Sequence, residues 1–306
     1  MQTRTPRLLL ALLPALVLTV GSVSPAAAAR LPGAPDCPVF LKTNVWKKAI
    51  DTLPVRRTSD TLISTIGLDA WLHPDFGSYA GYGIPYNIVS STTPRSRVSF
   101  EYADESDAGP YPIPATPKIE GGNDRHILMV DKDACRLYEL YAAEKTASGW
   151  IAGSGAIWDL RSNALRPAGW TSADAAGLPI LPGLVRYDEV AAGVIPHALR
   201  FTAPQTRDQY WYPARHYAGD GSDLSLPPMG LRVRLRADFD LSPFRGRARV
   251  ILVALKKYGM ILADNGSPWF ISGASDPRFD DDDLRQLRQV MGSDLEVVDT
   301  SSLRNG

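Results

Sequence analysis

Between about residue 67 and residue 240 the chain consists of short β-branched and aromatic runs separated by Gly, Pro, Asn and Asp. This pattern leaves little room for helices of ordinary length and is typical of strands joined by loops. The run Leu231–Phe239 alternates apolar residues with Arg232, Arg234 and Arg236, which predicts one buried and one solvated face. Because one wet face favours antiparallel pairing, we expect a mainly β fold, an antiparallel β-sandwich with a few short peripheral helices.

Individual elements follow from the same patterns. The clearest predicted strands are Arg97–Tyr102, His126–Asp131, Arg136–Ala142, Trp150–Leu160, Ala198–Thr202 and Leu231–Phe239. Two hairpins are expected, one from His126–Asp131 with Arg136–Ala142, and one from Met260–Ala263 with Trp269–Ser272 around an Asn-Gly turn. Helical spacing or capping signals predict four short helices, over residues 44–53, Ser59–Gly67 and Arg249–Tyr258 and after the aspartates at 280–283.

The first 29 residues predict a secretory signal peptide. Arg4 and Arg7 precede the apolar run Leu8–Val20, and Ala26–Ala29 supplies small residues for cleavage before residue 30. The apolar run is shorter than the roughly 20 residues a membrane span needs. No Cys follows the cleavage site, so we expect a secreted chain without a membrane anchor, with residues 30–306 forming a single mainly β domain.

Cys37 and Cys135 are the two cysteines of the sequence. In an exported chain, two cysteines most simply form one disulfide. This bond would tie the segment after the signal peptide to the strand that begins near Arg136. A thiol nucleophile or a pair of metal ligands is the alternative, although no CxxC spacing occurs.

The charge balance argues against nucleic acid as a partner. The chain has 33 basic and 33 acidic residues, and loss of residues 1–29 removes two arginines. Nucleic-acid binding requires a clear basic surplus. The sequence contains no G-x-S-x-G elbow, H-E-x-x-H motif, P-loop or EF-hand loop, so no cofactor is predicted. Its four histidines show no pair at metal-ligand spacing, and no metal site is predicted either.

Four carboxylates lie within Glu101–Asp107, between a predicted strand and a proline-rich loop. Paired carboxyl groups suit general acid–base work, and crowding raises the pKa of one of them. Asp104 and Glu105 are our candidates in this segment. A solvated acidic loop or a calcium site would use the same oxygens.

Two further segments combine aromatic and polar residues. Trp158, Trp170 and Asp174 lie in a Gly- and Pro-containing stretch, where indole rings can stack on sugars while carboxylates bind hydroxyl groups. The second segment, Tyr210–Tyr217, includes Trp211, Arg215 and His216. Arg215 can bind a carboxylate and His216 can move a proton, which would also serve β-elimination on a uronate polymer. Burial in a core is the alternative for each tryptophan, and a structural hydrogen bond is the alternative for His216.

The stretch from Asp159 to Asp188, which contains SNALRPAGWTSADAAGLPILPGLVRYD, and the later ALKKYGMILADNGSPWFISG resemble a group of secreted bacterial single-domain proteins. The resemblance implies export and a single domain, and it assigns no catalytic residue.

These observations predict a secreted carbohydrate-active protein, a hydrolase or lyase acting on extracellular polysaccharide. Asp174 and either Asp104 or Glu105 would form the carboxyl pair, with His216 as the alternative proton carrier. The predicted substrate-binding residues are Trp158, Trp170, Trp211 and Arg215. The alternatives are a non-catalytic glycan- or cell-surface-binding protein, a structural envelope protein and a metal-dependent secreted hydrolase. No oligomeric state is predicted.

Overall fold

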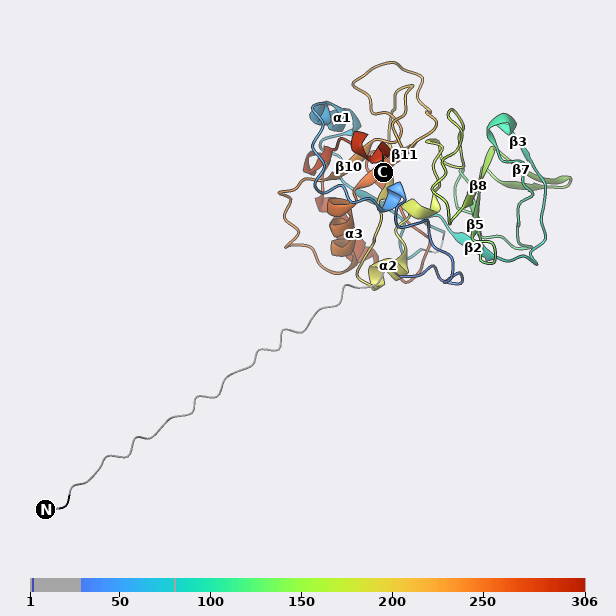
Figure 1. The fold of residues 1–306 in the computed structure, drawn as a ribbon, viewed down its shortest axis with the longest axis horizontal. Helices are drawn as coiled ribbons and strands as arrows, with labels where there is room; N and C mark the ends of the chain where they lie inside the picture. The colour runs from blue at the N-terminus through green and yellow to red at the C-terminus, as the bar shows by residue number, and fades with distance from the viewer. Residues whose placement is uncertain (1, 3–28, 80, 306) are drawn as a thin grey trace.

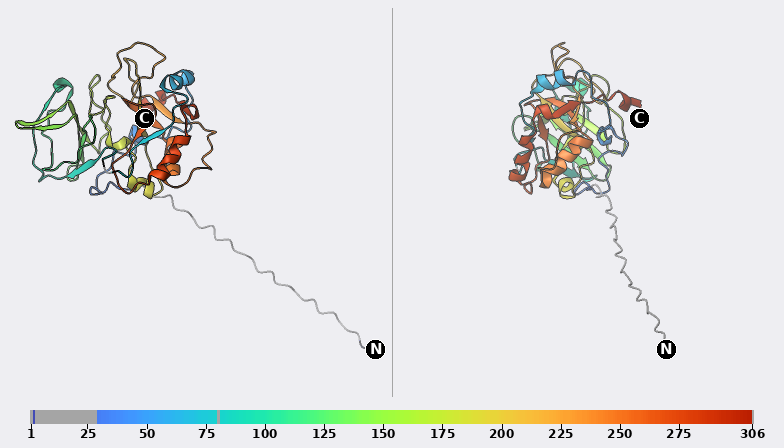
Figure 2. Two further views of the ribbon diagram at one scale, coloured as in Figure 1. Left: turned by 180° about the vertical axis from the view of Figure 1, so that it is seen from behind. Right: turned by 90° about the vertical axis from the view of Figure 1, so that its left-hand side faces the viewer.

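The computed structural model describes residue 2, residues 29–79 and residues 81–305. The predicted signal peptide therefore lies almost wholly outside the described residues. Figure 1 shows two groups of elements side by side, with β2, β3, β5, β7 and β8 in one and β10, β11, α1 and α3 in the other. The view from behind keeps the same separation (Figure 2). The predicted mainly β class is confirmed.

The larger group is built on a six-stranded sheet with the order β1-β12-β9-β11-β10-β13. Its strands are β1 (His73–Asp75), β12 (Phe270–Ser272), β9 (Leu199–Ala203), β11 (Met260–Asn265), β10 (Arg232–Leu235) and β13 (Leu295–Val297). The apolar core of this group includes Phe201, Leu252 and Trp269, all without exposed surface.

The smaller group contains a four-stranded sheet and a three-stranded sheet. The four-stranded sheet consists of β2 (Tyr86–Val89), β4 (Ile127–Asp131), β5 (Arg136–Tyr141) and β8 (Ser154–Asp159). The three-stranded sheet consists of β3 (Val98–Phe100), β7 (Gly149–Ala152) and β6 (Glu144–Thr146). Met129 and Tyr138 belong to a core shared with Trp150 of β7, whereas Leu128 and Leu137 belong to a second core. The four-stranded sheet is therefore covered on both faces, and every residue of β4 is buried.

Short helices surround the sheets. The α-helices are α1 (Ser59–Ile66), α2 (Tyr187–Ala191), α3 (Gly246–Lys257) and α4 (Asp281–Leu284). The 3-10 turns are η1 (Val45–Lys47), η2 (Ala103–Glu105), η3 (Leu181–Gly183), η4 (Arg285–Gln289), η5 (Gly292–Asp294) and η6 (Ser301–Asn305). The Asp280 carboxylate caps α4 by accepting hydrogen bonds from the Asp282 and Asp283 backbone N–H groups. The helices predicted at Ser59–Gly67 and Arg249–Tyr258 and after the aspartate run are confirmed to within a few residues.

The predicted antiparallel pairing describes only part of the structure, because each sheet also contains a parallel pair. β1 runs parallel to β12, β9 to β11, β2 to β4, and β3 to β7. In each case the two strands are separated by a long stretch of chain, which a parallel connection requires. Periodicity within one strand carries no information about which distant segment becomes its neighbour.

The predicted solvated face of Leu231–Phe239 is wrong. The observed strand β10 is shorter, and Arg232 and Arg234 are 1% and 5% exposed. Arg232 donates hydrogen bonds to the Tyr258, Lys48 and Val45 carbonyl groups. The segment around η1 therefore covers this face and supplies acceptors for the arginine, so a charged residue at every second position does not mark solvent here.

The predicted hairpin between residues 260–263 and 269–272 is also wrong. β9 lies between β11 and β12, parallel to the first and antiparallel to the second. A strand from a distant part of the chain has separated the two predicted partners. In contrast, the predicted hairpin of β4 and β5 is confirmed.

Two smaller predictions also need correction. Trp150–Leu160 is divided at Gly153 into β7 and β8, which belong to different sheets. An added Cβ at Gly153 would lie 2.6 Å from the Tyr141 ring, so this bend tolerates little but glycine. In residues 44–53 the regular structure is limited to the 3-10 turn Val45–Lys47.

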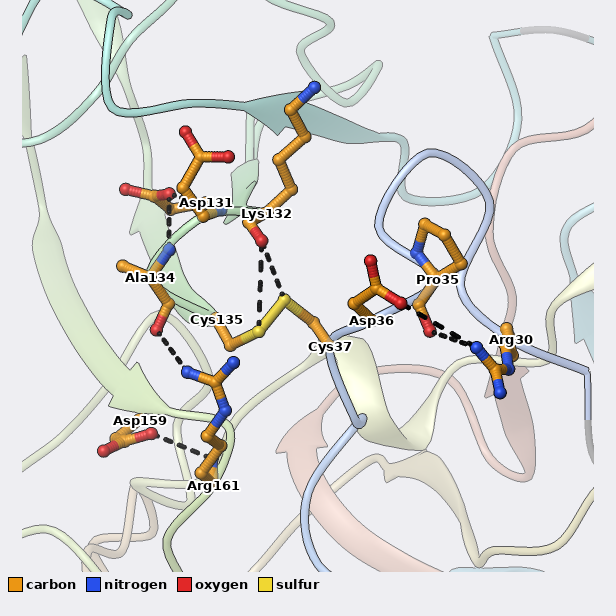
Figure 3. The surroundings of a disulfide bond; sticks show 11 residues. Arg30, Pro35, Asp36, Cys37, Asp131, Lys132, Ala134, Cys135, Asp159 and Arg161 are labelled. Carbon is orange, nitrogen blue, oxygen red and sulfur yellow. Dashed lines mark hydrogen bonds and ion pairs between the residues drawn. A yellow bond between two sulfur atoms is a disulfide. The ribbon is translucent and has the colours of Figure 1, made fainter.

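The predicted disulfide between Cys37 and Cys135 is present and joins residues 98 positions apart. Figure 3 shows it beside the β4–β5 turn, where the Asp131 carboxylate accepts hydrogen bonds from the Asp133 and Ala134 backbone N–H groups. The bond ties the N-terminal segment to the start of β5. No helix within residues 29–79 and 81–305 is long and apolar enough to cross a bilayer.

Candidate functional site

The three loops selected from the sequence meet in space. Glu105, at the end of η2, places its Oε2 atom 3.7 Å from Nε2 of His216. The same oxygen accepts a hydrogen bond of 2.8 Å from the Thr171 backbone N–H. The Glu105 and His216 side chains are 30% and 24% exposed, so this pair is accessible from solvent.

Arg166 holds this group together. Its guanidinium donates hydrogen bonds to the Asp107 carboxylate and to the Glu105 and Thr171 carbonyl groups, at 2.6, 2.7 and 2.6 Å. It also lies 5.7 Å from the centre of the Trp158 ring and 5.4 Å from that of Trp170. Sequence reasoning missed Arg166, because nothing in its own neighbourhood indicates that two loops and two indole rings surround it.

The other predicted residues take different positions. Trp158 is 5% exposed and its indole N–H donates to the Glu139 carboxylate. Arg215 is partly exposed and donates to the Arg166 carbonyl group at 2.8 Å. Trp211 contacts the guanidinium groups of Arg56 and Arg207, 4.1 and 5.3 Å from its ring centre. Asp104 is exposed.

Asp174 lies in the interior, at 1% exposure. Its two oxygens accept hydrogen bonds of 3.0 and 2.7 Å from Nε and Nη2 of Arg200 in β9. A third nitrogen of Arg200 donates to Ser272 of β12. The catalytic role of Asp174 stays a prediction, and in this structure its carboxylate is enclosed by the arginine that it positions.

Asp264 is a further carboxyl group in this region, and the sequence predicted no functional role for it. It follows a shift in the β9–β11 register, and its Oδ2 lies 3.7 Å from Nη2 of Arg200. The Asp264 side chain is 27% exposed. Burial, together with the nearby Asp174 charge, raises the pKa of Asp264 to about 7. In the sequence Asp264 directly precedes Asn265-Gly266, a pattern that predicts a turn and not a chemical role.

His126 and Glu120 form a second acid–base pair. Nδ1 of His126 is hydrogen-bonded to Oε2 of Glu120, and its Nε2 lies 2.9 Å from the Ala173 carbonyl oxygen. Burial lowers the pKa of His126, but the hydrogen bond to Glu120 and the Glu120 charge outweigh burial and raise it to about 9. With an acceptor at each ring nitrogen, the imidazole is held in its protonated form.

Glu139 lies on β5 and has no exposed surface. It accepts hydrogen bonds from the Ile180 and Leu181 backbone N–H groups, each at 3.0 Å, and from the Trp158 indole. Burial raises the pKa of Glu139 to about 7 despite these donors. Its contacts fix the segment that leads into η3.

Residues 173–176 join these groups. Ala173 contacts His126, Asp174 binds Arg200, and the Ala175 carbonyl lies 2.8 Å from Nδ1 of His216. The Ala176 N–H donates to the carbonyl of Ala263, the residue before Asp264. Four extended residues span at most about 14 Å. The Glu105–His216 pair and the Glu120–His126 pair therefore border the same short segment.

The chemistry of His216 follows from its hydrogen bond. The Ala175 carbonyl can only accept, so it holds a proton on Nδ1 and leaves Nε2 as the atom that gains or loses one. This atom lies 3.7 Å from Oε2 of Glu105. Among the residues that the structure describes, no group of three or more His, Cys, Asp or Glu side chains is arranged to hold a metal ion.

Comparisons with protein-family models, with curated proteins and with solved structures find no match to this chain.

Proposed function

We propose that this protein is a secreted hydrolase of extracellular glycan that works by acid–base catalysis. The observation that carries the proposal is the convergence of three loops, which places Glu105 3.7 Å from His216 beside the Arg166–Trp170 stack. Each loop separately had an ordinary structural explanation. Their meeting at a solvent-accessible carboxylate–imidazole pair is what a hydrolytic site requires.

The proposed reaction assigns one proton transfer to Asp264 and the other to His216. Hydrolysis of a glycosidic bond needs one group that protonates the leaving oxygen and another that activates water. Asp264, whose pKa is raised by burial and by the Asp174 charge, would be the acid. Nε2 of His216 would take a proton from water, and Glu105 would stabilise the resulting imidazolium. Asp174 would act as a positioning residue through Arg200.

The charge around the site favours hydrolysis over the lyase reaction. Burial and the nearby carboxylates of Asp124 and Glu101 raise the pKa of Tyr141, so acidic groups gather at this edge of β5. A uronate polymer would meet repulsion here, since like charges disfavour approach. An uncharged glycan would not. The disulfide between Cys37 and Cys135 supports the proposal of an exported protein.

The test is a screen of the mature chain on β-1,3-glucan, β-1,4-glucan, xylan, mannan and chitin, with detection of new reducing ends. We expect product from at least one of them, and at least a 100-fold lower kcat for His216→Asn, Glu105→Gln and Asp264→Asn. Asp104→Asn shows whether the neighbouring carboxylate can replace Glu105. We expect it to leave kcat within threefold of the wild-type value. Asp238→Asn, in an exposed ion pair, serves as the matched control.

Two other outcomes would replace the proposal. Retention on an insoluble glycan without product would identify a non-catalytic binding protein that uses the same loops. Activity that disappears with a chelator and returns with zinc or calcium would indicate the metal-dependent alternative. If the protein is retained on none of these glycans and releases product from none of them, a carbohydrate function is contradicted altogether.

A further inference from the structure

A cleft of about 900 Å³ lies between the four-stranded sheet and the α2 region of the larger group. One wall is the edge strand β2 with the proline-rich segment that ends at Ile119, and the other is formed by the start of α2 and residues 274–278. The acid–base residues Glu105, His216 and Asp264 do not line it. The cleft is large enough for a ligand of several rings.

Arg278 organises the polar side of this cleft. It donates to both oxygens of Asp188, at 3.1 and 3.2 Å, and to both oxygens of Asp276, at 2.9 and 2.6 Å. Its guanidinium also lies 4.2 Å from the centre of the Tyr187 ring. Because Nη2 contacts both carboxylates, one oxygen of each lies within about 6 Å of the other. The two acceptor groups are therefore held in fixed positions.

These groups remain available to a ligand. The Asp188 side chain is 29% exposed and that of Asp276 is 17% exposed. Each carboxylate offers about four lone-pair sites, of which Arg278 uses only part. Hydrogen bonds that Arg278 donates keep the pKa of Asp276 below its ordinary value against the opposing effect of burial, so this carboxylate is an acceptor at neutral pH.

The remaining lining decides which ligand fits. Arg278 and Lys118 balance the charges of Asp188 and Asp276, and the third cation of the lining, Arg186, is buried in an ion pair with Glu189. The cleft therefore favours neither a polyanion nor a polycation. Tyr86 and several prolines supply apolar wall. Paired acceptors next to rigid apolar surface match the adjacent hydroxyl groups and C–H faces of a sugar chain.

We propose that this cleft is a second glycan-binding groove, which holds an uncharged oligosaccharide apart from the acid–base residues. The proposal rests on the proposed function only for the class of ligand. In its action it is separate, because the groove would retain polymer and would transfer no proton.

The experiment measures binding of uncharged hexasaccharides of β-1,3-glucan, β-1,4-glucan and β-1,4-xylan to the full mature chain by titration calorimetry. We expect the combined variant Asp188→Asn/Asp276→Asn to weaken binding at least tenfold, with Asp238→Asn equal to wild type. Hexagalacturonate and a proline-rich peptide are the comparison ligands. Unchanged affinity in the combined variant, or binding only of hexagalacturonate or of the peptide, would overturn the proposal.

A second measurement does not depend on the fold of the variant. In wild-type protein, NMR signals of the Arg278 Nε–H and the Tyr187 ring should shift on addition of the hexasaccharide that binds. Shifts confined to the Glu105–His216 region, or no shift at millimolar ligand, would refute the groove.

The same proteins separate this proposal from the proposed function. Loss of product in Asp264→Asn with unchanged binding in the combined variant would leave the hydrolase and reject the groove. Hexasaccharide binding that the combined variant loses, without product from wild type, would retain the groove and reject the hydrolase.

Discussion

Arg200 and Arg232 lie in the same six-stranded sheet and are 4% and 1% exposed, but their charges are met in opposite ways. Arg200 binds the Asp174 carboxylate, and Arg232 donates to main-chain carbonyl groups. Burial disfavours the charged form of both arginines. It lowers the pKa of Arg232 to about 9, whereas at Arg200 the Asp174 carboxylate outweighs burial and the pKa is raised. Carbonyl oxygens satisfy a guanidinium's N–H groups without cancelling its charge.

The difference distinguishes an arginine that contacts the candidate site from one that has only a structural role. Arg200 connects the sheet to Asp174 and to the partly exposed Asp264, so its ion pair reaches the candidate site. Arg232 closes the side of β10 that faces the η1 segment, and its partners are the Val45, Lys48 and Tyr258 carbonyl groups. Equal burial of the same residue type therefore says little about role until the partner is known.

The largest expected effect is that of breaking the Arg200–Asp174 pair. Arg200→Met leaves a buried carboxylate without its cation, and we expect the free energy of unfolding to fall by about 3–5 kcal/mol. Urea denaturation measures it. The double variant Arg200→Met/Asp174→Asn should lose less than the single one, because no unpaired charge remains. An equal or greater loss in the double variant would contradict a compensated pair.

Arg232→Met tests the other side of the comparison. It removes a desolvated charge but leaves buried carbonyl groups without donors, so we expect a loss of about 1–3 kcal/mol by the same measurement. Activity on any glycan should be unchanged at saturating substrate. A cost that exceeds that of Arg200→Met would show that the carbonyl groups compensate the charge better than a carboxylate does.

A pH series sharpens the comparison at His126, whose pKa is raised in the folded state to about 9. Since the folded protein binds this proton more tightly than the unfolded chain, the contribution is complete below about pH 6.5 and is lost as the pH rises to 9. Each pKa unit is worth about 1.4 kcal/mol, so a pKa raised from 6.5 to about 9 sets the loss at no more than about 3 kcal/mol. His126→Gln should flatten this part of the profile. A wild-type stability that rises over the same range relative to that variant would exclude the Glu120–His126 pair.

The smallest effect is expected at Arg236, the third arginine of the same sequence pattern. Its ion pair with Asp238 is exposed, with 47% and 76% of the two side chains accessible. Exposed pairs contribute little, so Arg236→Ala should change the free energy of unfolding by no more than about 0.5 kcal/mol. A loss similar to that of Arg232→Met would mean that the strand continues as a buried element beyond Leu235.

Local signals predicted what depends on neighbouring residues. The β4–β5 hairpin, the helix after Ser59 and the Asp280 cap involve partners a few positions apart, so propensity and turn chemistry suffice to find them. The candidate site is of another kind. Their residue types single out Glu105 and His216 in the sequence, but the approach of the two side chains depends on Arg166. The Asn-Gly pattern places Asp264 in a turn and gives no sign of its ion pair with Arg200.

The sequence by itself determined the mainly β class, the disulfide and the chemical types gathered in three loops, because these follow from composition, pairing of two cysteines and short-range pattern. Only the tertiary structure decided that β9 separates β11 from β12, that Arg232 is covered, and that Asp174 is enclosed while Asp264 meets solvent. The physical reason is that burial and electrostatic environment are set by segments up to hundreds of residues apart. The sequence around a residue does not show which distant segments will pack against it.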